Sequence, residues 1–293
     1  MRKQVGAILP LTLIIMAVLS VLAIGVVSQA RERLEFAVDQ QNEFADFIAI
    51  NNAVTKAAYR ISIGVPSANA FGLKEQKVYV DGREMDIDGV KVKIQDSAGL
   101  INLASAPKRD LIGVLRIFTD ASQASAIAED IDNWRSTSYT SRSPRSGEAE
   151  EYVPRHSLLR SVDELLEIPG IGQADFYNPA EGKVGLRDFV LAGGVGWYNF
   201  ATMPKELLTS LYSLNERQVA TLISARMDDD WSRLQQLQMS WGLNSEMPNV
   251  PSHRFLMTLQ GNYFKGRAMI EITTGGLPVF NKTLWQYPDA ARY

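Results

Sequence analysis

Residues 7–30 read AILPLTLIIMAVLSVLAIGVVSQA, and this stretch decides the fold because it contains no charged side chain. As a helix it would extend about 36 Å, and a transmembrane helix needs about 20 apolar residues. Arg2 and Lys3 precede it, so the positive-inside rule predicts a cytoplasmic N-terminus and export of the residues after the helix. Arg31 and Arg33 come directly after it and weaken that charge bias.

Three kinds of N-terminal segment fit these residues. A cleaved secretory signal would end at Ser28-Gln29-Ala30, but its apolar core is normally shorter than this one. A plain signal anchor is the second alternative. The third is a prepilin-type leader, in which the short polar segment MRKQVG ends in Gly6 and cleavage leaves Ala7 as the first residue.

The residues after the apolar stretch favour the prepilin-type alternative. Residues 31–62 contain no Pro or Gly and are rich in Ala, Glu, Gln and Phe, which favours a helix that continues out of the membrane. Apolar side chains recur on one face at spacings of three and four: Phe44, Phe47, Ile48, Val54, Ala57, Ala58 and Ile61. We therefore predict one rod from residue 7 to 62, broken near Gly64-Val65-Pro66.

Composition excludes several classes of function. The 293-residue chain has no Cys, which removes thiol catalysis, disulfides and zinc-thiolate sites. Its two histidines, His156 and His253, are far apart in sequence, and no nucleotide-binding or hydrolase motif appears. The net charge of -3 provides no general attraction for nucleic acid. We expect a protein without catalytic residues that is not an enzyme.

The rest of the chain divides into strands, helices and strands again. Period-two alternation at 77–80, 85–87 and 90–94 predicts a meander, with turns at Asp81-Gly82 and Asp88-Gly89. Further strands are predicted at 255–259, 268–273 and 279–285, and helices at 110–134, 161–168, 204–211 and 216–226. The predicted fold class is α+β: a long N-terminal membrane helix packed on an antiparallel sheet, pilin-like, with a large, mostly helical insertion. The expected divisions are 1–6 leader, 7–30 membrane helix, 31–106 helix and first strands, 107–245 insertion and 246–293 final strands.

Two local patterns have both a structural and a chemical interpretation. The segment 161–171, with its Pro169-Gly170 turn, has the outline of a helix-hairpin-helix phosphate grip, but acidic residues flank it, which favours packing. A looser copy lies at 204–226. Carboxylates gather at 129–132, 148–151 and 228–230, where Ca²⁺ ligation competes with the simpler interpretation of a solvated face.

Taken together, these features resemble the K-type minor pseudopilins of the type II secretion system (general secretion pathway protein K). The resemblance rests on the leader, on residues 90–103, on the Ser-Val-x-Glu-Leu-x-x-Ile-Pro-Gly segment at 161–170 and on 198–208. Most pilins carry Glu at the fifth mature position, whereas K-type subunits do not, and Leu11 occupies it here. Two features depart from the family pattern. Ala201 replaces the second Asn of the Asn-x-Asn pair, and residues 133–138 lack the carboxylates of the family's calcium loop.

The resemblance implies a structural role in protein export. A prepilin peptidase would cut between Gly6 and Ala7 and methylate the new amine. The subunit would then cap a pseudopilus with I-type and J-type partners and other pseudopilins, anchored once in the bacterial inner membrane with its C-terminal domain in the periplasm. No cofactor is required; Glu150 and Glu151 resemble the later acidic part of the calcium site, but the missing carboxylates argue against carrying Ca²⁺ over. Two alternatives stay open: a minor pilin of a type IV pilus or competence pseudopilus, and a membrane-tethered nucleic-acid binder. Nucleic acid is not an expected partner.

Overall fold

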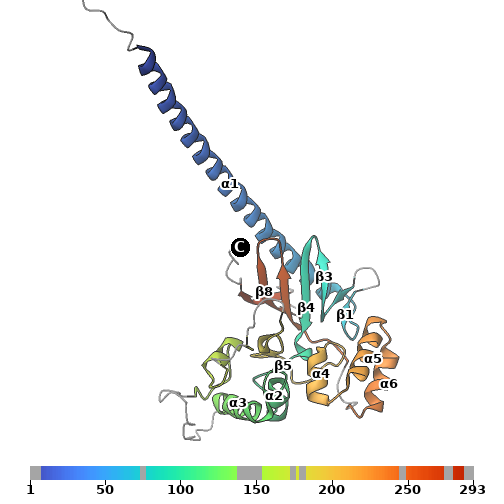
Figure 1. Ribbon diagram of the computed structural model, residues 1–293. Helices are drawn as coiled ribbons and strands as arrows, with labels where there is room; N and C mark the ends of the chain where they lie inside the picture. The colour runs from blue at the N-terminus through green and yellow to red at the C-terminus, as the bar shows by residue number, and fades with distance from the viewer. Residues whose placement is uncertain are drawn as a thin grey trace, which may run out of the picture.

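The computed structural model describes residues 8–72, 77–136, 154–171, 176–177, 183–243, 249–273 and 280–286. A long helix, α1, projects from a head, as Figure 1 shows. The sheet of the head packs on the lower end of α1, and the remaining helices gather on the far side of the sheet. This arrangement confirms the predicted α+β fold class, with a long apolar helix, an antiparallel sheet and a mostly helical insertion.

Helix α1 runs unbroken through Ile8–Ile63, 56 residues or about 84 Å. The predicted rod is therefore one helix from residue 8 onward, while Ala7 lies outside the described residues. The helix ends where predicted, and Gly64 follows it at a position too crowded for a side chain. A Cβ on Gly64 would lie 2.7 Å from the carbonyl oxygen of Arg60.

The main sheet has five strands in the order β3-β4-β7-β8-β9, and every neighbouring pair is antiparallel. Its strands are β3 (Asp81–Ile87), β4 (Val90–Asp96), β7 (Arg254–Gln260), β8 (Lys265–Ile272) and β9 (Phe280–Gln286). Because β4 pairs directly with β7, the first and last strand groups form one discontinuous sheet, as the sequence predicts.

One predicted turn is confirmed and the other is wrong. Asp88 and Gly89 have φ values of 55° and 81° and join β3 to β4, as expected of a primed hairpin turn. Asp81 and Gly82 are instead the first two residues of β3, and the register with β4 shifts between Asp81 and Glu84. The positive φ of Gly82, 81°, serves this bulge. The chain does not reverse there, because β2 (Val78–Tyr79) pairs with β1 (Ala70–Phe71) and not with β3.

The insertion is more finely divided than the sequence pattern predicts. The region 110–134 contains two helices rather than one, since Asp120 accepts hydrogen bonds from the N–H groups of Ser122 and Gln123 and starts a new helix. The segment 161–168 forms a 3₁₀ helix, and α6 and a parallel strand pair were not predicted. The elements are β5 (Ile101–Asn102), α2 (Lys108–Leu115), α3 (Ala121–Arg135), η3 (Val162–Glu167), η4 (Leu186–Asp188), β6 (Val190–Leu191), α4 (Lys205–Tyr212), α5 (Glu216–Met227) and α6 (Trp231–Ser240).

The described residues bury two large hydrophobic clusters. One packs α1 on a single face of the sheet and includes Ile50, Ala57, Ile94, Met257 and Ile270. The other lies inside the insertion and is built mainly on α2 to α6. A small third cluster of Leu100, Leu191 and Leu256 connects the insertion to the opposite face of the sheet. The numerical domain limits stay predictions.

Candidate assembly site

The N-terminal half of α1, its upper half in Figure 1, exposes an apolar surface that nothing in the described chain covers. Along the described residues, α1 is the one helix long and apolar enough to cross a membrane, and its most apolar window has a mean hydropathy of 2.7 and no buried residue. Leu13, Val21 and Ile24 are each at least 60% exposed. Water around so many apolar side chains is unfavourable, so this half of α1 is suited to lipid or to other apolar helices.

The predicted processing and metal residues fall at different places. Leu11 lies on the exposed part of α1, with 58% of its surface accessible. Its place as the fifth mature residue stays a prediction. Gly6, Ala7, Glu150 and Glu151 lie outside the described residues. The cleavage site and the calcium ligands therefore stay predictions.

The lower half of α1 is fixed to the sheet by packing and by one buried carboxylate. Small residues such as Ala53, Ala57 and Ala58 are buried and let the helix approach the strands closely. Asp46 is 6% exposed, and its carboxylate accepts hydrogen bonds of 2.9 Å from the N–H groups of Asn262, Tyr263 and Phe264. These three residues form the turn between β7 and β8, so Asp46 ties the helix to a hairpin more than 200 positions away.

Lys56 and Asp88 add an exposed ion pair between α1 and the β3–β4 turn. Both side chains are about half exposed, so water screens the pair and it contributes little to stability. The orientation of α1 on the head therefore depends mainly on the buried apolar contacts and on Asp46.

A second buried carboxylate, Asp96, joins the insertion to the sheet. Its Oδ1 accepts hydrogen bonds from the N–H of Ala98 at 3.1 Å and from the N–H and Oγ of Ser252 at 3.0 and 2.5 Å. Its Oδ2 accepts from Thr202 Oγ1 at 3.1 Å and Asn199 Nδ2 at 3.3 Å. Burial raises the pKa of this carboxyl above its ordinary range, although the hydrogen bonds act in the opposite direction.

The position of Asp96 explains this network. It ends β4, where the chain leaves the sheet, while Ser252 stands just before β7, where the chain returns. Thr202 and Asn199 belong to the insertion itself. One side chain thus fixes the exit, the return and the body of the insertion, and it is fully buried.

The residues on either side of the Pro169-Gly170 turn pack into the insertion, while Pro169 is half-buried and Gly170 is exposed. Ile168 and Ile171, on either side of it, are 1% and 0% exposed. A Cβ on Gly170, whose φ is 84°, would lie 3.1 Å from the side chain of Ile127 on α3. The burial of both isoleucines and the close approach of Gly170 to Ile127 support the packing interpretation.

Several of the remaining acidic residues have structural partners. Asp132 pairs with Arg135, Asp229 pairs with Lys77, and Asp230 caps α6 by accepting from the N–H of Arg233. Among the described residues, no three His, Asp or Glu side chains converge in a way that could hold a metal ion.

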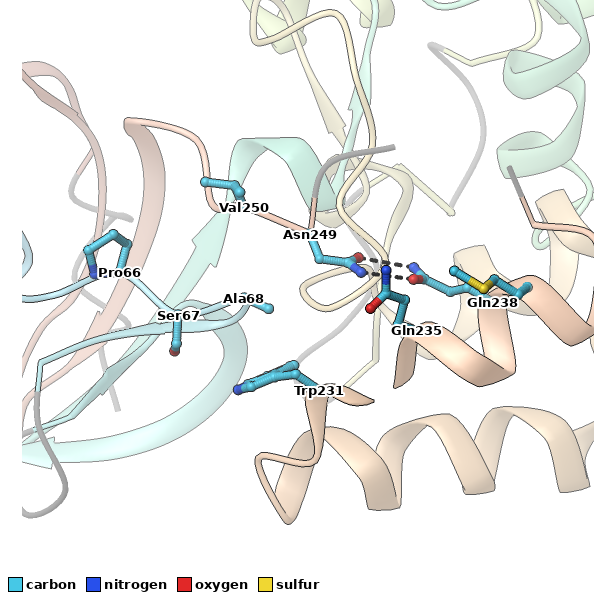
Figure 2. Close-up of a pocket in the computed structure, with 9 residues that line it drawn as sticks. Pro66, Ser67, Ala68, Trp231, Gln235, Gln238, Asn249 and Val250 are labelled. Atoms are coloured by element: carbon cyan, nitrogen blue, oxygen red, sulfur yellow. Dashed lines mark hydrogen bonds between the residues drawn. The ribbon is translucent and has the colours of Figure 1, made fainter. Parts of the chain in front are cut away.

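A neutral cleft of about 440 Å³ separates α6 from the segment that comes after α1. Figure 2 shows Pro66, Ser67 and Ala68 on one side and Trp231, Gln235 and Gln238 on the other. The Gln238 and Asn249 side-chain amides exchange two hydrogen bonds of 3.0 and 2.8 Å at the edge of this cleft. That pair of amides fixes residues 249–250 to α6. Because these residues lead into β7, the cleft belongs to the junction between the insertion and the sheet.

Comparison with known proteins identifies the fold. No protein-family model and no curated protein matches the sequence. Among solved structures, one chain of the crystal structure of the GspK–GspI–GspJ complex from the type 2 secretion system of enterotoxigenic Escherichia coli matches with a TM-score of 0.52 and 15% identity. The match covers 86% of this chain and 98% of that one. The chain has the fold of a GspK-like pseudopilin.

The extent of this match confirms the fold that the sequence resemblance implies. Because the match covers 86% of this chain, it must include residues of both the pilin-like part and the insertion. Sequence reasoning found this architecture but missed Asp46 and Asp96, the two carboxylates that hold its parts together.

Proposed function

We propose that this protein is a K-type minor pseudopilin at the tip of a type II secretion pseudopilus, where it helps to start assembly and so supports protein export. The role is structural, needs no cofactor and involves no catalysis. The observation that carries the proposal is the continuity of α1. One rigid helix presents an uncovered apolar half and ends in a head with a GspK-like fold.

The shape of the head favours a tip position. In a filament of parallel helices, each subunit above the first must fit over the head of the subunit below it. The insertion lies on the side of the sheet away from the start of α1, as Figure 1 shows, and would obstruct such stacking. Leu11 agrees with this position, because an aliphatic side chain supplies no carboxylate for pairing with the N-terminal amine of a neighbour.

The proposal includes processing and orientation. A prepilin peptidase cuts between Gly6 and Ala7 and methylates Ala7, α1 crosses the inner membrane once, and the head lies in the periplasm. Arg2 and Lys3 on the cytoplasmic side support this orientation. The exposed residues of α1 between the membrane and the head, such as Phe36 and Phe44, would then contact the helices of partner subunits.

Co-purification tests the partners. The tagged full-length chain, expressed with the I-type and J-type pseudopilins of the same genome and extracted in mild detergent, should retain both of them through purification. Minor pilins of a type IV or competence system from that genome should not be retained. Selective retention of those pilins would assign the chain to the other system.

A pair of glycine variants tests the leader. Gly6→Ala should leave an uncleaved precursor that migrates more slowly on a gel. Gly25→Ala is the matched control: Gly25 lies inside α1, and a Cβ there would meet no atom within 4 Å. Cleavage of Gly6→Ala at the normal position would contradict the leader assignment, while normal cleavage of Gly25→Ala is expected.

A further inference from the structure

A cavity of about 360 Å³ lies between the sheet and the insertion, on the face of the sheet opposite α1. Strands β7 and β8 form one side, and segments 159–163 and 187–193 of the insertion form the other. It is separate from the cleft of Figure 2, which is lined by 66–68, by α6 and by 249–250. We refer to it as the arginine pocket, because Arg160, Arg187, Arg254 and Arg267 line it.

The floor of the arginine pocket is apolar. Leu191 and Leu256 are buried there beside Leu159, and Met269 packs against them. A small hydrated anion would leave this floor without a contact. A ligand with an aliphatic part would cover it and remove apolar surface from water.

Two of the four arginines have mainly structural roles. Arg267 donates a hydrogen bond of 2.9 Å to the carbonyl oxygen of Arg187 and lies 3.7 Å from Asp188, so it fastens the insertion to the sheet. Burial also lowers the pKa of the Arg267 guanidinium, which shows that the nearby carboxylates only partly compensate this charge. Arg187 pairs with Asp163 at 3.4 Å.

Arg254 and Arg160 have guanidinium N–H donors available for a ligand. Arg254 forms one long contact, 3.3 Å, with Glu271 on the adjacent strand, and its Nε is buried without a hydrogen-bond partner among the described residues. Arg160 is exposed, and its guanidinium forms no ion pair within the described part of the chain. An unpaired, buried guanidinium N–H carries a desolvation cost that a bound carboxylate would remove.

We propose that the arginine pocket binds an acidic segment of a protein partner, with a Glu or Asp carboxylate on Arg254 and Arg160 and an adjacent aliphatic side chain on the leucine floor. The planar guanidinium matches a carboxylate through two parallel N–H donors. The proposal goes beyond the pseudopilin role, because it assigns a recognition chemistry to the head itself. The pocket lies away from α1, so a partner can occupy it while the helix remains packed.

Peptide binding to the full-length chain tests this assignment. The chain is held in nanodiscs of zwitterionic phosphatidylcholine, and binding is followed by the anisotropy of the fluorescein-labelled peptide Gly-Leu-Glu-Glu-Leu-Gly, with an amidated C-terminus. We expect saturable binding that weakens as salt rises. The double variant Arg160→Gln/Arg254→Gln should raise the Kd about tenfold or more. The peptide with Gln in place of both Glu residues should bind at least about tenfold more weakly than the acidic peptide.

Arg217→Gln is the matched control, since it removes one exposed cation on α5, which contributes no residue to the arginine pocket, and it should leave the Kd unchanged. Several outcomes overturn the proposal: no binding of the acidic peptide, equal binding of the Gln peptide, or an unchanged Kd in the double variant. Competition by inorganic phosphate at the concentration of the peptide would identify a simple anion site instead. None of these results bears on co-purification with the I-type and J-type subunits, so the two proposals fail independently.

Discussion

The two parts of the head are stabilised in different ways. In the pilin-like part, the lower half of α1 covers one face of a five-stranded sheet, and the core is one continuous apolar layer. In the insertion, short helices and 3₁₀ turns surround a separate core and begin at capping side chains such as Asp120, Ser161 and Asn215. Apolar packing aligns the first part, whereas local hydrogen bonds define the limits of the elements in the second.

The connection between the two parts reflects this difference. Apolar contacts in the described connection include the small cluster around Leu256 and Ala68 in the insertion core. Many of the other contacts are polar, including the hydrogen bonds of Asp96, the Gln238–Asn249 amides and the contacts of Arg267. Polar contacts fix a geometry closely but lose it when one partner is removed. We expect substitutions at the junction, such as those at Asp96, to uncouple unfolding of the insertion from unfolding of the sheet. Substitutions between α1 and the sheet, such as those at Asp46, should lower the stability of helix and sheet together.

The largest effect is expected at Asp96. Asp96→Asn keeps one acceptor oxygen, but its new NH₂ group must face either the Asn199 amide donor or the backbone N–H groups of Ala98 and Ser252. We expect a loss of about 3 kcal/mol in unfolding free energy, measured by urea denaturation of the full chain in detergent. Tryptophan fluorescence, to which Trp134, Trp231 and Trp241 in the insertion contribute, should change at lower urea than the circular dichroism of the chain.

The control for this variant is Asp120→Asn. Asp120 caps α3 through two backbone N–H groups, and Asn is about as good a cap as Asp. This change should cost less than about 0.5 kcal/mol. Equal losses in the two variants would mean that Asp96 is not a special connection between the parts.

The next largest effect is expected at Asp46, on the other side of the comparison. Asp46→Asn removes at least one of three hydrogen bonds to the β7–β8 turn and presents donors to N–H groups. We expect a loss of about 2 kcal/mol, smaller than at Asp96 because fewer groups depend on this carboxylate. The circular dichroism and fluorescence transitions should move together. Asp39→Asn, at an exposed position on the same helix, is the control and should have no measurable effect.

The sequence predicts the two parts unequally, for a physical reason. The apolar run at 7–30 and the period-two strands are signals within a few neighbouring residues, so the limits of α1, β4, β7 and β9 are predicted to within two residues. Strands β3 and β8 begin four and three residues before the predicted strands. Asp96 and Ser252 are 156 positions apart, and Asp46 is 216 positions from Asn262. No local pattern distinguishes these carboxylates from solvated ones. The four arginines of the pocket are likewise dispersed, and only the pairing of β7 with β8 and the return of the insertion bring them together.

A smaller effect is expected within the insertion. Asn215 and Gln218 form a capping box at the start of α5, with reciprocal hydrogen bonds of 2.9 and 3.0 Å. Asn215→Ala should cost about 1 kcal/mol and lower the urea midpoint of the fluorescence transition. Thr221→Ala, one turn further along the exposed side of α5, is the control and should cost less than half of that. If the two variants had equal cost, capping would not be what defines this helix.

The smallest effect is a pH dependence of the connection itself. Because burial and hydrogen bonds oppose each other at Asp96, its raised pKa reflects only their difference. Between the ordinary Asp pKa of 3.8 and the raised pKa of Asp96, the folded chain binds more protons than the unfolded chain. The contribution of Asp96 to stability therefore increases as the pH falls through this range. The same contribution is lost as the pH rises through it. Asn at position 96 cannot titrate, and every other carboxyl cancels when the two proteins are compared at each pH.

The difference in unfolding free energy between wild type and Asp96→Asn should therefore widen on acidification from pH 7 towards pH 4, as measured by urea midpoints. A gap that narrows over this range would mean that the hydrogen bonds outweigh burial, so that the junction is held by a carboxylate stabilised in its charged form.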